Sequence, residues 1–190
     1  MRWIVLVALL GLCDAAQGQD RAFETLDVYV SGTANVYENF LHEFWSLGQG
    51  GQLVVTTPFY FGDVAVGGSY HRYTAEAASV PPFDGLFAFV GWEMPWQPNP
   101  RLRLAAGARL GNYRMAFDDP NAEFAGIRNE SEFSVAAHAR VQFYLTRRLA
   151  LNASGNYQKT YTFFRLKLWY AAVGLSYQLD TPNWLKRVLR

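Results

Sequence analysis

The feature that most constrains this chain is a period-two alternation of apolar and polar side chains, sustained over long segments. Its last example, Arg165–Leu179, places apolar residues on one face: Trp169, Ala171, Val173, Leu175, Tyr177 and Leu179. Successive side chains of a strand point to opposite faces, so this pattern predicts a β-strand. The segment exceeds the usual five or six residues of a soluble strand and the roughly 9–11 residues of a tilted strand that crosses a bilayer.

The same alternation predicts eight strands in all. They are Thr25–Val36, Gln52–Phe61, Val64–Thr74, Phe83–Met94, Arg101–Met115, Glu130–Leu145, Leu149–Tyr157 and Arg165–Leu179. The faces of the third strand stay unresolved, because similar residues fall on both sides of it. Pro58 predicts a bulge in the second strand, and Pro95, Pro98 and Pro100 predict the end of the fourth. Gly62 and Asp63 are expected in a tight turn. Connections after the odd-numbered strands are longer than those after the even-numbered ones.

The N-terminus predicts an export signal over residues 1–18. Arg2 forms a basic start, Trp3–Leu12 is apolar, and Ala16 to Gly18 offer small residues for cleavage. The only cysteine, Cys13, lies inside this segment, and Leu12 before it argues against lipidation. Beyond the signal no apolar run approaches the ~18 residues of a transmembrane helix. A mature chain that enters a membrane must therefore do so as a closed barrel.

The whole mature chain resembles the small eight-stranded outer-membrane barrels of the OmpA and OmpX type. The resemblance rests on topology and patterning, and on Gly174, Tyr177 and Leu179, which are similar to the C-terminal signal read by the barrel assembly machinery. The sequence departs from that signal in having Ala172 at a position where the family prefers a polar residue, and in continuing past Leu179.

The resemblance implies an all-β fold: an eight-stranded antiparallel up-and-down transmembrane barrel over residues 19–180, with a short amphipathic tail over residues 181–190. It also implies outer-membrane lipid around the wall and both termini in the periplasm. A soluble lipocalin-like barrel is the main alternative fold. It is disfavoured because it would have to bury faces that carry Arg, His, Asn and Ser.

The tail is expected to form a short helix with Thr181 as its N-cap and Pro182 at its first position. Trp184, Leu185, Val188 and Leu189 would line one face, with the basic residues off it. A bilayer interface could stabilise such a helix. A frayed basic tail remains the alternative.

The inward faces predict a polar network in the lumen. Its members are Asp27, Glu93, Arg103, Arg109, Glu132, His138 and Arg140. Eight strands leave an interior that side chains can fill, so the barrel is expected not to conduct. We expect Glu93 to contact Arg103, with Asp27 nearby. Arg109 and His138 are expected at similar depth, with a neutral His138 and polar partners such as Asn152.

For function, the sequence favours a non-enzymatic envelope protein with a structural or surface-loop binding role. Phe40, Phe44 and Trp45 in the first long loop are the candidate contact with a surface ligand or partner protein, and Trp92, Trp169 and Trp184 are the candidate interfacial anchors. A lipid A-modifying enzyme is the alternative, although the residues after His71 and His138 do not form the His-x-Ser pair of the small-barrel deacylases. The formal charge of +1 gives no electrostatic case for nucleic acid. No cofactor or metal is expected.

Overall fold

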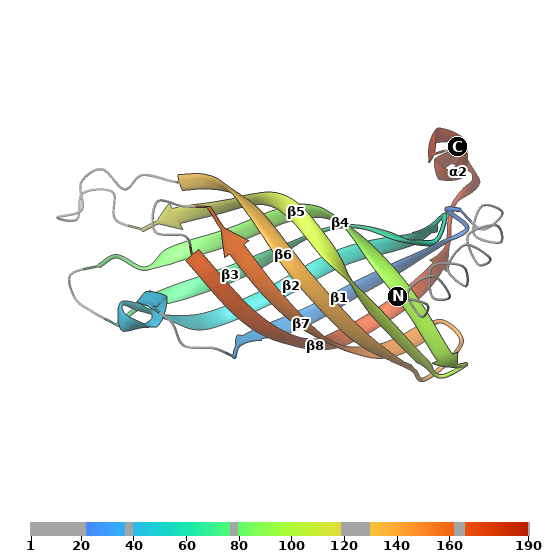
Figure 1. Cartoon of the computed structure of the whole chain (residues 1–190), viewed down its shortest axis with the longest axis horizontal. Coiled ribbons are helices and arrows are strands. Elements are labelled where there is room, and N and C mark those ends of the chain that lie inside the picture. The colour runs from blue at the N-terminus through green and yellow to red at the C-terminus, as the bar shows by residue number, and fades with distance from the viewer. Residues whose placement is uncertain (1–21, 37–39, 77–79, 119–129, 162–165, 190) are drawn as a thin grey trace, which may run out of the picture.

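The computed structural model describes residues 22–36, 40–76, 80–118, 130–161 and 166–189. They form a closed barrel in which each strand pairs antiparallel with its sequence neighbours and β1 pairs with β8 (Figure 1). The strands are β1 (Thr25–Asn35), β2 (Trp45–Phe59), β3 (Gly62–Ala75), β4 (Phe83–Asn99), β5 (Leu102–Phe117), β6 (Glu130–Tyr144), β7 (Leu149–Thr160) and β8 (Leu166–Asp180). The predicted eight-stranded up-and-down barrel is confirmed. The predicted export signal lies outside the described residues and stays a prediction.

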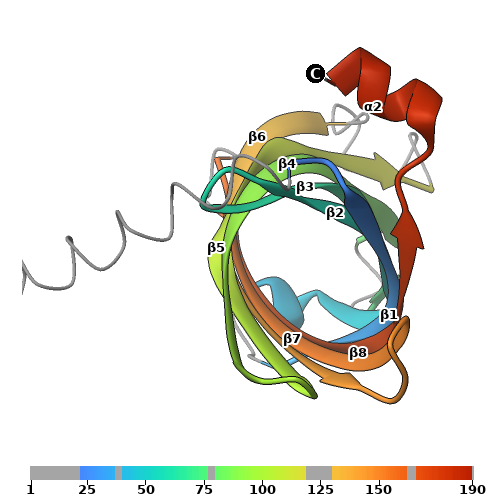
Figure 2. The ribbon, with the colours of Figure 1, turned by 90° about the vertical axis from the view of Figure 1, so that its right-hand side faces the viewer.

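Two short helices accompany the strands. The 3-10 helix η2 (Phe40–Glu43) precedes β2, and α2 (Asn183–Leu189) follows β8. Seen along the barrel, the strands make a closed ring with α2 outside it (Figure 2). The pairing of Thr25 with Asp180 places the start of β1 and the end of β8 at the same end of the barrel. In the described part of the chain, no helix is long and apolar enough to cross a membrane.

The wall sorts its side chains as the alternation predicts. Val30, Leu53 and Val173 expose 61%, 53% and 67% of their surface on the outside. On the inside, Tyr29, Arg109 and Gln142 are buried. The structure also resolves the faces of β3, whose inward residues include Asp63, Ala65, Ser69, His71 and Tyr73. An apolar exterior around a closed hydrogen-bonded wall is the arrangement that a hydrocarbon environment requires.

The fourth strand does not end at Met94, as its prolines predicted, but continues to Asn99 with an irregularity between Trp96 and Asn99. The pairing of β3 with β4 stops at Glu93, so the last residues of β4 pair only with β5. A strand with a neighbour on one side only can contain proline, because fewer of its backbone N–H groups must donate to a ladder. Here β4 continues past the end of β3, while β5 beside it keeps its pairing with β6 as far as Leu102.

The second strand begins at Trp45, inside the region predicted as a loop. Its first residues pair with β3 alone, because its pairing with β1 starts only at Gly51. The predicted bulge at Pro58 is wrong: the register shift lies between Leu47 and Gln49, and Pro58 pairs with Asp63 without interruption. Pro58 lies beyond the last β1–β2 pair, at Thr56, so its missing N–H group removes no bond to β1.

The turn between β2 and β3 lies earlier than predicted. Tyr60 has a φ of 53°, in the left-handed region that tight hairpin turns use, and β3 starts at Gly62. Asp63 therefore belongs to the strand and points into the barrel, where its side chain is 2% exposed.

The cap of α2 also differs from the prediction. The carbonyl of Pro182 accepts hydrogen bonds from the backbone of Leu185 and Lys186, so Pro182 occupies the N-cap position. The Thr181 hydroxyl is buried and makes no hydrogen bond. Its backbone N–H donates instead to the carbonyl of Glu24, which fastens the end of β8 to the start of β1.

The seam between β1 and β8 depends on Gly174. A Cβ atom at this position would lie 1.9 Å from the Val30 carbonyl oxygen and 2.5 Å from the Ser31 Cα. Because the two backbones approach so closely, only glycine fits there without a shift of the strands. The glycine of the C-terminal pattern thus has a structural reason, whereas its recognition by the assembly machinery, together with Tyr177 and Leu179, stays a prediction.

The direction in which the side chains of β6 point can be tested by introducing one charged residue. Ala137 faces outward, midway along a cross-strand row that runs from Trp92 through Ala108 and Ala137 to Tyr157 and Trp169. An arginine at Ala137 should lower the free energy of unfolding by about 2–4 kcal/mol, because charges near the midplane of a barrel's outer face are costly. The measurement is urea unfolding in lipid vesicles.

The matched control is Ala116→Arg, which introduces the same charge near the rim of β5. It should cost about 0–1 kcal/mol, since the penalty falls toward the interfaces. Equal costs at the two positions would contradict a hydrocarbon belt around the middle of the wall.

Candidate functional site: the charged interior

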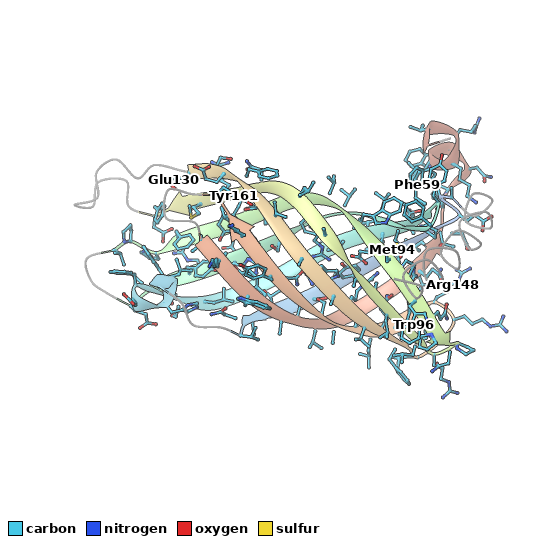
Figure 3. The ribbon with its side chains drawn as sticks, viewed as in Figure 1. Phe59, Met94, Trp96, Glu130, Arg148 and Tyr161 are labelled. Atoms are coloured by element: carbon cyan, nitrogen blue, oxygen red, sulfur yellow. The ribbon has the colours of Figure 1, made fainter. Side chains whose placement is uncertain are left out.

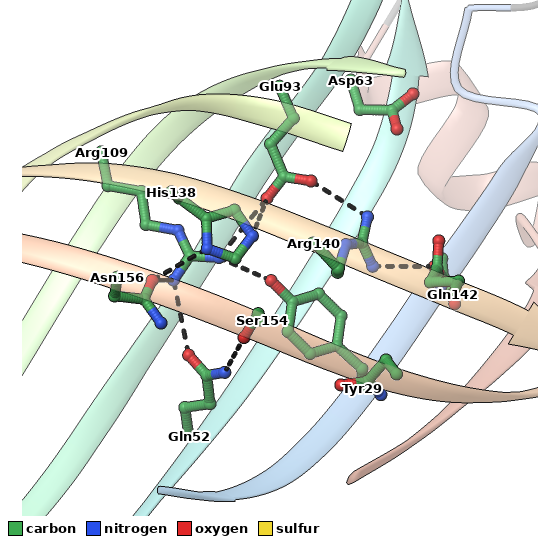
Figure 4. Close-up of polar contacts among 12 residues, drawn as sticks. Tyr29, Gln52, Asp63, Glu93, Arg109, His138, Arg140, Gln142, Ser154 and Asn156 are labelled. Atoms are coloured by element: carbon green, nitrogen blue, oxygen red, sulfur yellow. Dashed lines mark hydrogen bonds and ion pairs between the residues drawn. The ribbon is translucent and has the colours of Figure 1, made fainter. Parts of the chain in front are cut away.

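The centre of the interior is Glu93, a fully buried carboxylate on β4. Its Oε2 lies 3.0 Å from Nη2 of Arg140, and its Oε1 lies 3.4 Å from Nη2 of Arg109 (Figure 4). His138 Nε2 is 3.3 Å from the same Oε1, at an angle that does not make a hydrogen bond. A buried carboxylate is tolerated when cations and donors surround it, and Glu93 has two guanidinium groups in contact.

The two arginines extend this contact across the barrel. Arg109 donates to the Tyr29 hydroxyl at 2.6 Å, to Asn156 Oδ1 at 3.0 Å and to Gln52 Oε1 at 3.4 Å. Its guanidinium carbon lies 4.5 Å from the centre of the Phe89 ring. One side chain from β5 therefore reaches β1, β2, β4 and β7.

Arg140 also contacts more than one strand, and it lies nearer the end of the barrel that carries the termini. Its Nη1 lies 3.2 Å from Asp27 Oδ2, and its guanidinium stacks 4.5 Å from the centre of the Tyr29 ring. Gln142 donates to the same Asp27 oxygen at 2.7 Å and to Ser176 at 3.0 Å. A planar guanidinium suits this site because it can bind two carboxylates and stack on a ring at once.

The predicted contact between Glu93 and Arg103 is wrong. Arg103 forms its ion pair with Asp63, which the sequence analysis predicted in a turn. The interior thus balances three carboxylates, Asp27, Asp63 and Glu93, against three guanidinium groups, Arg103, Arg109 and Arg140. This balance removes the excess of positive charge that the sequence implied around Arg109 and Arg140.

The polar partners also differ in part from those expected. His138 Nδ1 lies 2.8 Å from Asn156 Oδ1, whereas Asn152 Oδ1 accepts from Ser31 at 2.9 Å. Glu132 lies on the inward face of β6, paired with Tyr113 near the other end of the strand, and is only half-buried. The structure therefore joins five of the seven predicted network residues through contacts, pairs Arg103 separately with Asp63 and leaves Glu132 apart from them.

Toward the end opposite the termini the interior becomes aromatic. The Tyr73 and Tyr170 hydroxyls hydrogen-bond, His71 stacks on Tyr170 at 4.2 Å, and Phe83 stacks on Tyr73 at 4.5 Å. Between this layer and Arg109 lies a cavity of about 10 Å³. Such a space is about the size that one water molecule needs. At this level of the described interior, side chains therefore leave little free space.

The candidate loop contact with a ligand or partner stays a prediction, and Trp45 is half-buried among side chains near the end of the barrel opposite the termini. Its Nε1 donates to the Pro81 carbonyl at 2.7 Å, and its ring meets Phe83 at 5.5 Å and Phe117 at 6.4 Å. Phe44 packs against Trp45 at 5.7 Å. The side chain of Phe40 lies outside the described residues.

The three histidines occupy different places. His138 and His71 point into the barrel, and both ring nitrogens of His71 lack a hydrogen bond, which leaves them facing the small cavity. His42 lies in η2, where its Nε2 pairs with the Asn35 amide. Among the described residues, no group of three or more His, Cys, Asp or Glu could hold a metal ion.

The predicted anchors lie on the outer surface. Trp92 packs against Phe61 at 5.1 Å near the end with the termini, and Trp169 packs against Tyr157 at 4.6 Å. Trp184 on α2 is 63% exposed. Their role as membrane anchors stays a prediction.

The charged network inside the barrel predicts a large loss of stability when one of its carboxylates is neutralised. Glu93→Gln should lower the free energy of unfolding by about 3–5 kcal/mol, because Arg140 and Arg109 would keep their buried charges without the carboxylate. Denaturant unfolding of the refolded barrel measures this change.

Asp180→Asn is the matched control, since it removes the carboxylate of the exposed pair between Arg148 and Asp180. Exposed pairs contribute about 0–1 kcal/mol, so this change should be nearly neutral. A Glu93→Gln variant as stable as Asp180→Asn would contradict the central position of Glu93.

Comparisons with known proteins agree with this architecture. No protein-family model and no curated protein matches the chain. Among solved structures, Neisserial surface protein A shows 13% identity over 82% of this chain and 96% of its own, with a TM-score of 0.54. The Yersinia pestis outer membrane protein Ail in a nanodisc shows 15% identity over 82% and 99%, with a TM-score of 0.54. The N-terminal barrel of Pseudomonas aeruginosa OprF shows 12% identity over 84% and 100%, with a TM-score of 0.53. This chain therefore has the fold of the small eight-stranded outer-membrane β-barrels.

Proposed function

We propose that this protein is a non-enzymatic, non-conducting barrel of the bacterial outer membrane, with both termini in the periplasm. The observation that carries the proposal is the interior: six charged residues pair with one another across the lumen, and the cavity above them is about 10 Å³. An eight-stranded barrel whose lumen is filled in this way offers its outer wall and its loops for contacts. Its role would then be structural or that of a binding surface.

The position of the histidines supports a non-enzymatic role. Acyl chains of lipid lie against the outer face of the wall, whereas His71 and His138 point into the lumen and are 1% and 4% exposed. A group that acts on lipid must reach the reacting bond with a proton-transfer partner in hydrogen-bond range. Neither of these two buried histidines has such access.

The closed interior predicts the absence of stable single-channel currents. The purified barrel, refolded in detergent and inserted into planar bilayers, should give no conductance steps, because charged side chains and aromatic rings occupy the lumen. A general porin inserted into the same bilayers serves as the positive control. Correct folding should be checked by the change in gel migration on boiling. Reproducible current steps from the folded protein would replace this proposal with a pore.

A non-enzymatic role predicts unchanged lipid A. Mass spectrometry of lipid A from cells with and without the gene should show the same acyl pattern. An acyl group gained or lost only in the presence of the gene would favour a lipid-modifying enzyme. In that case a Glu93→Gln variant that still folds would show whether the interior takes part.

A further inference from the structure

The outside of the barrel carries an excess of positive charge at the end where β1 begins and β8 ends. Arg101, in the turn between β4 and β5, and Arg147, in the turn between β6 and β7, are exposed, and so is Arg187 on α2. Lys186 on the same helix is half-buried. Within the described part of the chain, none of these four side chains forms an ion pair.

Acidic residues at this end do not balance that charge. Among the described residues there, only Glu24 and Asp180 carry an exposed carboxylate. Asp180 already pairs with a fifth cation, Arg148, at 2.8 Å. Four cations therefore face a single remaining exposed carboxylate in the described residues of this end, which leaves positive charge for an external anion.

The cations lie along one continuous stretch of the molecule. The backbone N–H of Tyr144 donates to the Arg101 carbonyl at 2.8 Å, so the turn before β5 lies beside the end of β6. The backbone N–H of Gln178 donates to the Arg148 carbonyl at 2.8 Å, so the turn before β7 lies beside the end of β8. Helix α2 follows β8 after two residues. We call the four cations on this stretch the basic arc: Arg101, Arg147, Lys186 and Arg187.

The position of α2 places it over lipid and not under the lumen. Seen along the barrel, the helix lies outside the ring of strands (Figure 2), and seen from the side it lies at the level of the barrel end (Figure 1). Its start is held there, because the buried Thr181 donates its backbone N–H to the Glu24 carbonyl at 3.0 Å. In a membrane, the space beside the outer wall is occupied by lipid.

The helix also has an uncovered apolar side. Trp184 and Val188 are four residues apart, which puts them on the same side of a helix, and they expose 63% and 75% of their surface. A helix of seven residues is marginal in water by itself. A bilayer interface would cover the two apolar side chains and leave the nearby cations at the headgroups.

Aromatic side chains show where that interface lies along the barrel. Figure 3 shows Phe59, Trp96 and Arg148 at the end that carries α2, away from Glu130 and Tyr161. Phe61 and Trp96, which expose 56% and 65% of their surface, lie on the outside at this end. Exposed aromatic residues are typical of the level where headgroups meet hydrocarbon. The turns that carry the basic arc therefore lie at headgroup level, where the anionic group within reach is a lipid phosphate.

We propose that the basic arc and α2 form a binding surface for anionic glycerophospholipids of the phosphatidylglycerol type. The apolar side of α2 lies in the interface, and the four cations attract the phosphate groups around it. The choice of lipid rests on the proposed function, because periplasmic termini place this end of the barrel at the inner leaflet of the outer membrane.

The charge contribution can be tested by lipid retention in native mass spectrometry. The mature protein, purified after export, is incubated in detergent with equal amounts of phosphatidylglycerol and phosphatidylethanolamine. The wild type should retain phosphatidylglycerol preferentially. R187Q on the helix and R147Q in the turn should each lower this preference about fivefold, the contribution of one cation near an anionic lipid surface. R114Q removes an exposed arginine without an ion pair from the opposite end and should keep the wild-type preference.

The place of the helix is tested separately with a spin label. The only cysteine of the chain, Cys13, lies in the predicted export signal, so Val188→Cys provides a single labelling site in the mature protein. In vesicles that contain phosphatidylglycerol, this label should be more accessible to oxygen than to a water-soluble nickel complex. A label at Glu24→Cys, an exposed polar position at the same end, should show the reverse. The change in gel migration on boiling confirms that each variant is folded.

Three results would overturn the inference. They are equal lipid preference of R187Q and R114Q, a Val188→Cys label as accessible to nickel as the one at Glu24→Cys, and, in a second competition, a preference of the wild type for lipid A over phosphatidylglycerol. The third would place this end at the outer leaflet and contradict the proposed orientation. Conductance of the lumen is measured independently, so a failure of the non-conducting proposal is distinguishable from a failure of the lipid surface.

Discussion

The structure depends on the neutralisation of charge inside a narrow barrel. Each buried carboxylate or guanidinium loses its hydration, and only opposite charges and hydrogen bonds can compensate for that loss. Glu93 supplies the opposite charge for Arg109 and Arg140 at once, and Arg140 also forms an ion pair with Asp27. Because these residues come from β1, β4, β5 and β6, the network ties opposite walls of the barrel together. Because the side chains of this network reach across the lumen, they leave little free space around them.

The interior and the exterior are separated by a single layer of backbone, and each strand serves both. On β6, His138 and Arg140 join the polar network, while Ala139 between them is exposed on the outer face. On β7, Asn156 contacts Arg109 from the inside, and Gly155 leaves a depression on the outside. Any change at one of these positions is therefore felt on one face only, which makes matched pairs of variants informative for this fold.

The two faces of the wall differ in chemistry. Charged and aromatic side chains meet on the inside, where His71 and His138 are also buried. The outer wall is apolar: bulky residues cover much of it, and smaller residues line part of the face of β5–β8.

The sequence by itself determined the class of fold and the direction of most side chains. Period-two alternation identifies a strand and its two faces without any knowledge of its neighbours, so Ala136 and Ala137 could be assigned to opposite sides. The same pattern identified six of the charged and polar residues that meet in the lumen. This prediction needed only the local sequence, because the face to which a side chain points is set within its own strand.

The tertiary structure alone decided which residues meet and where strands end. Arg103 pairs with Asp63 and not with Glu93, because the turn at Tyr60 shifts Asp63 into β3 and points it inward. Met94 does not end β4, because the absence of β3 beside the last residues makes prolines acceptable there. Trp45 packs against Phe83 because β2 extends past β1 and runs beside β3 there. These outcomes depend on register between strands, which is set by the whole closed barrel and which no single segment encodes.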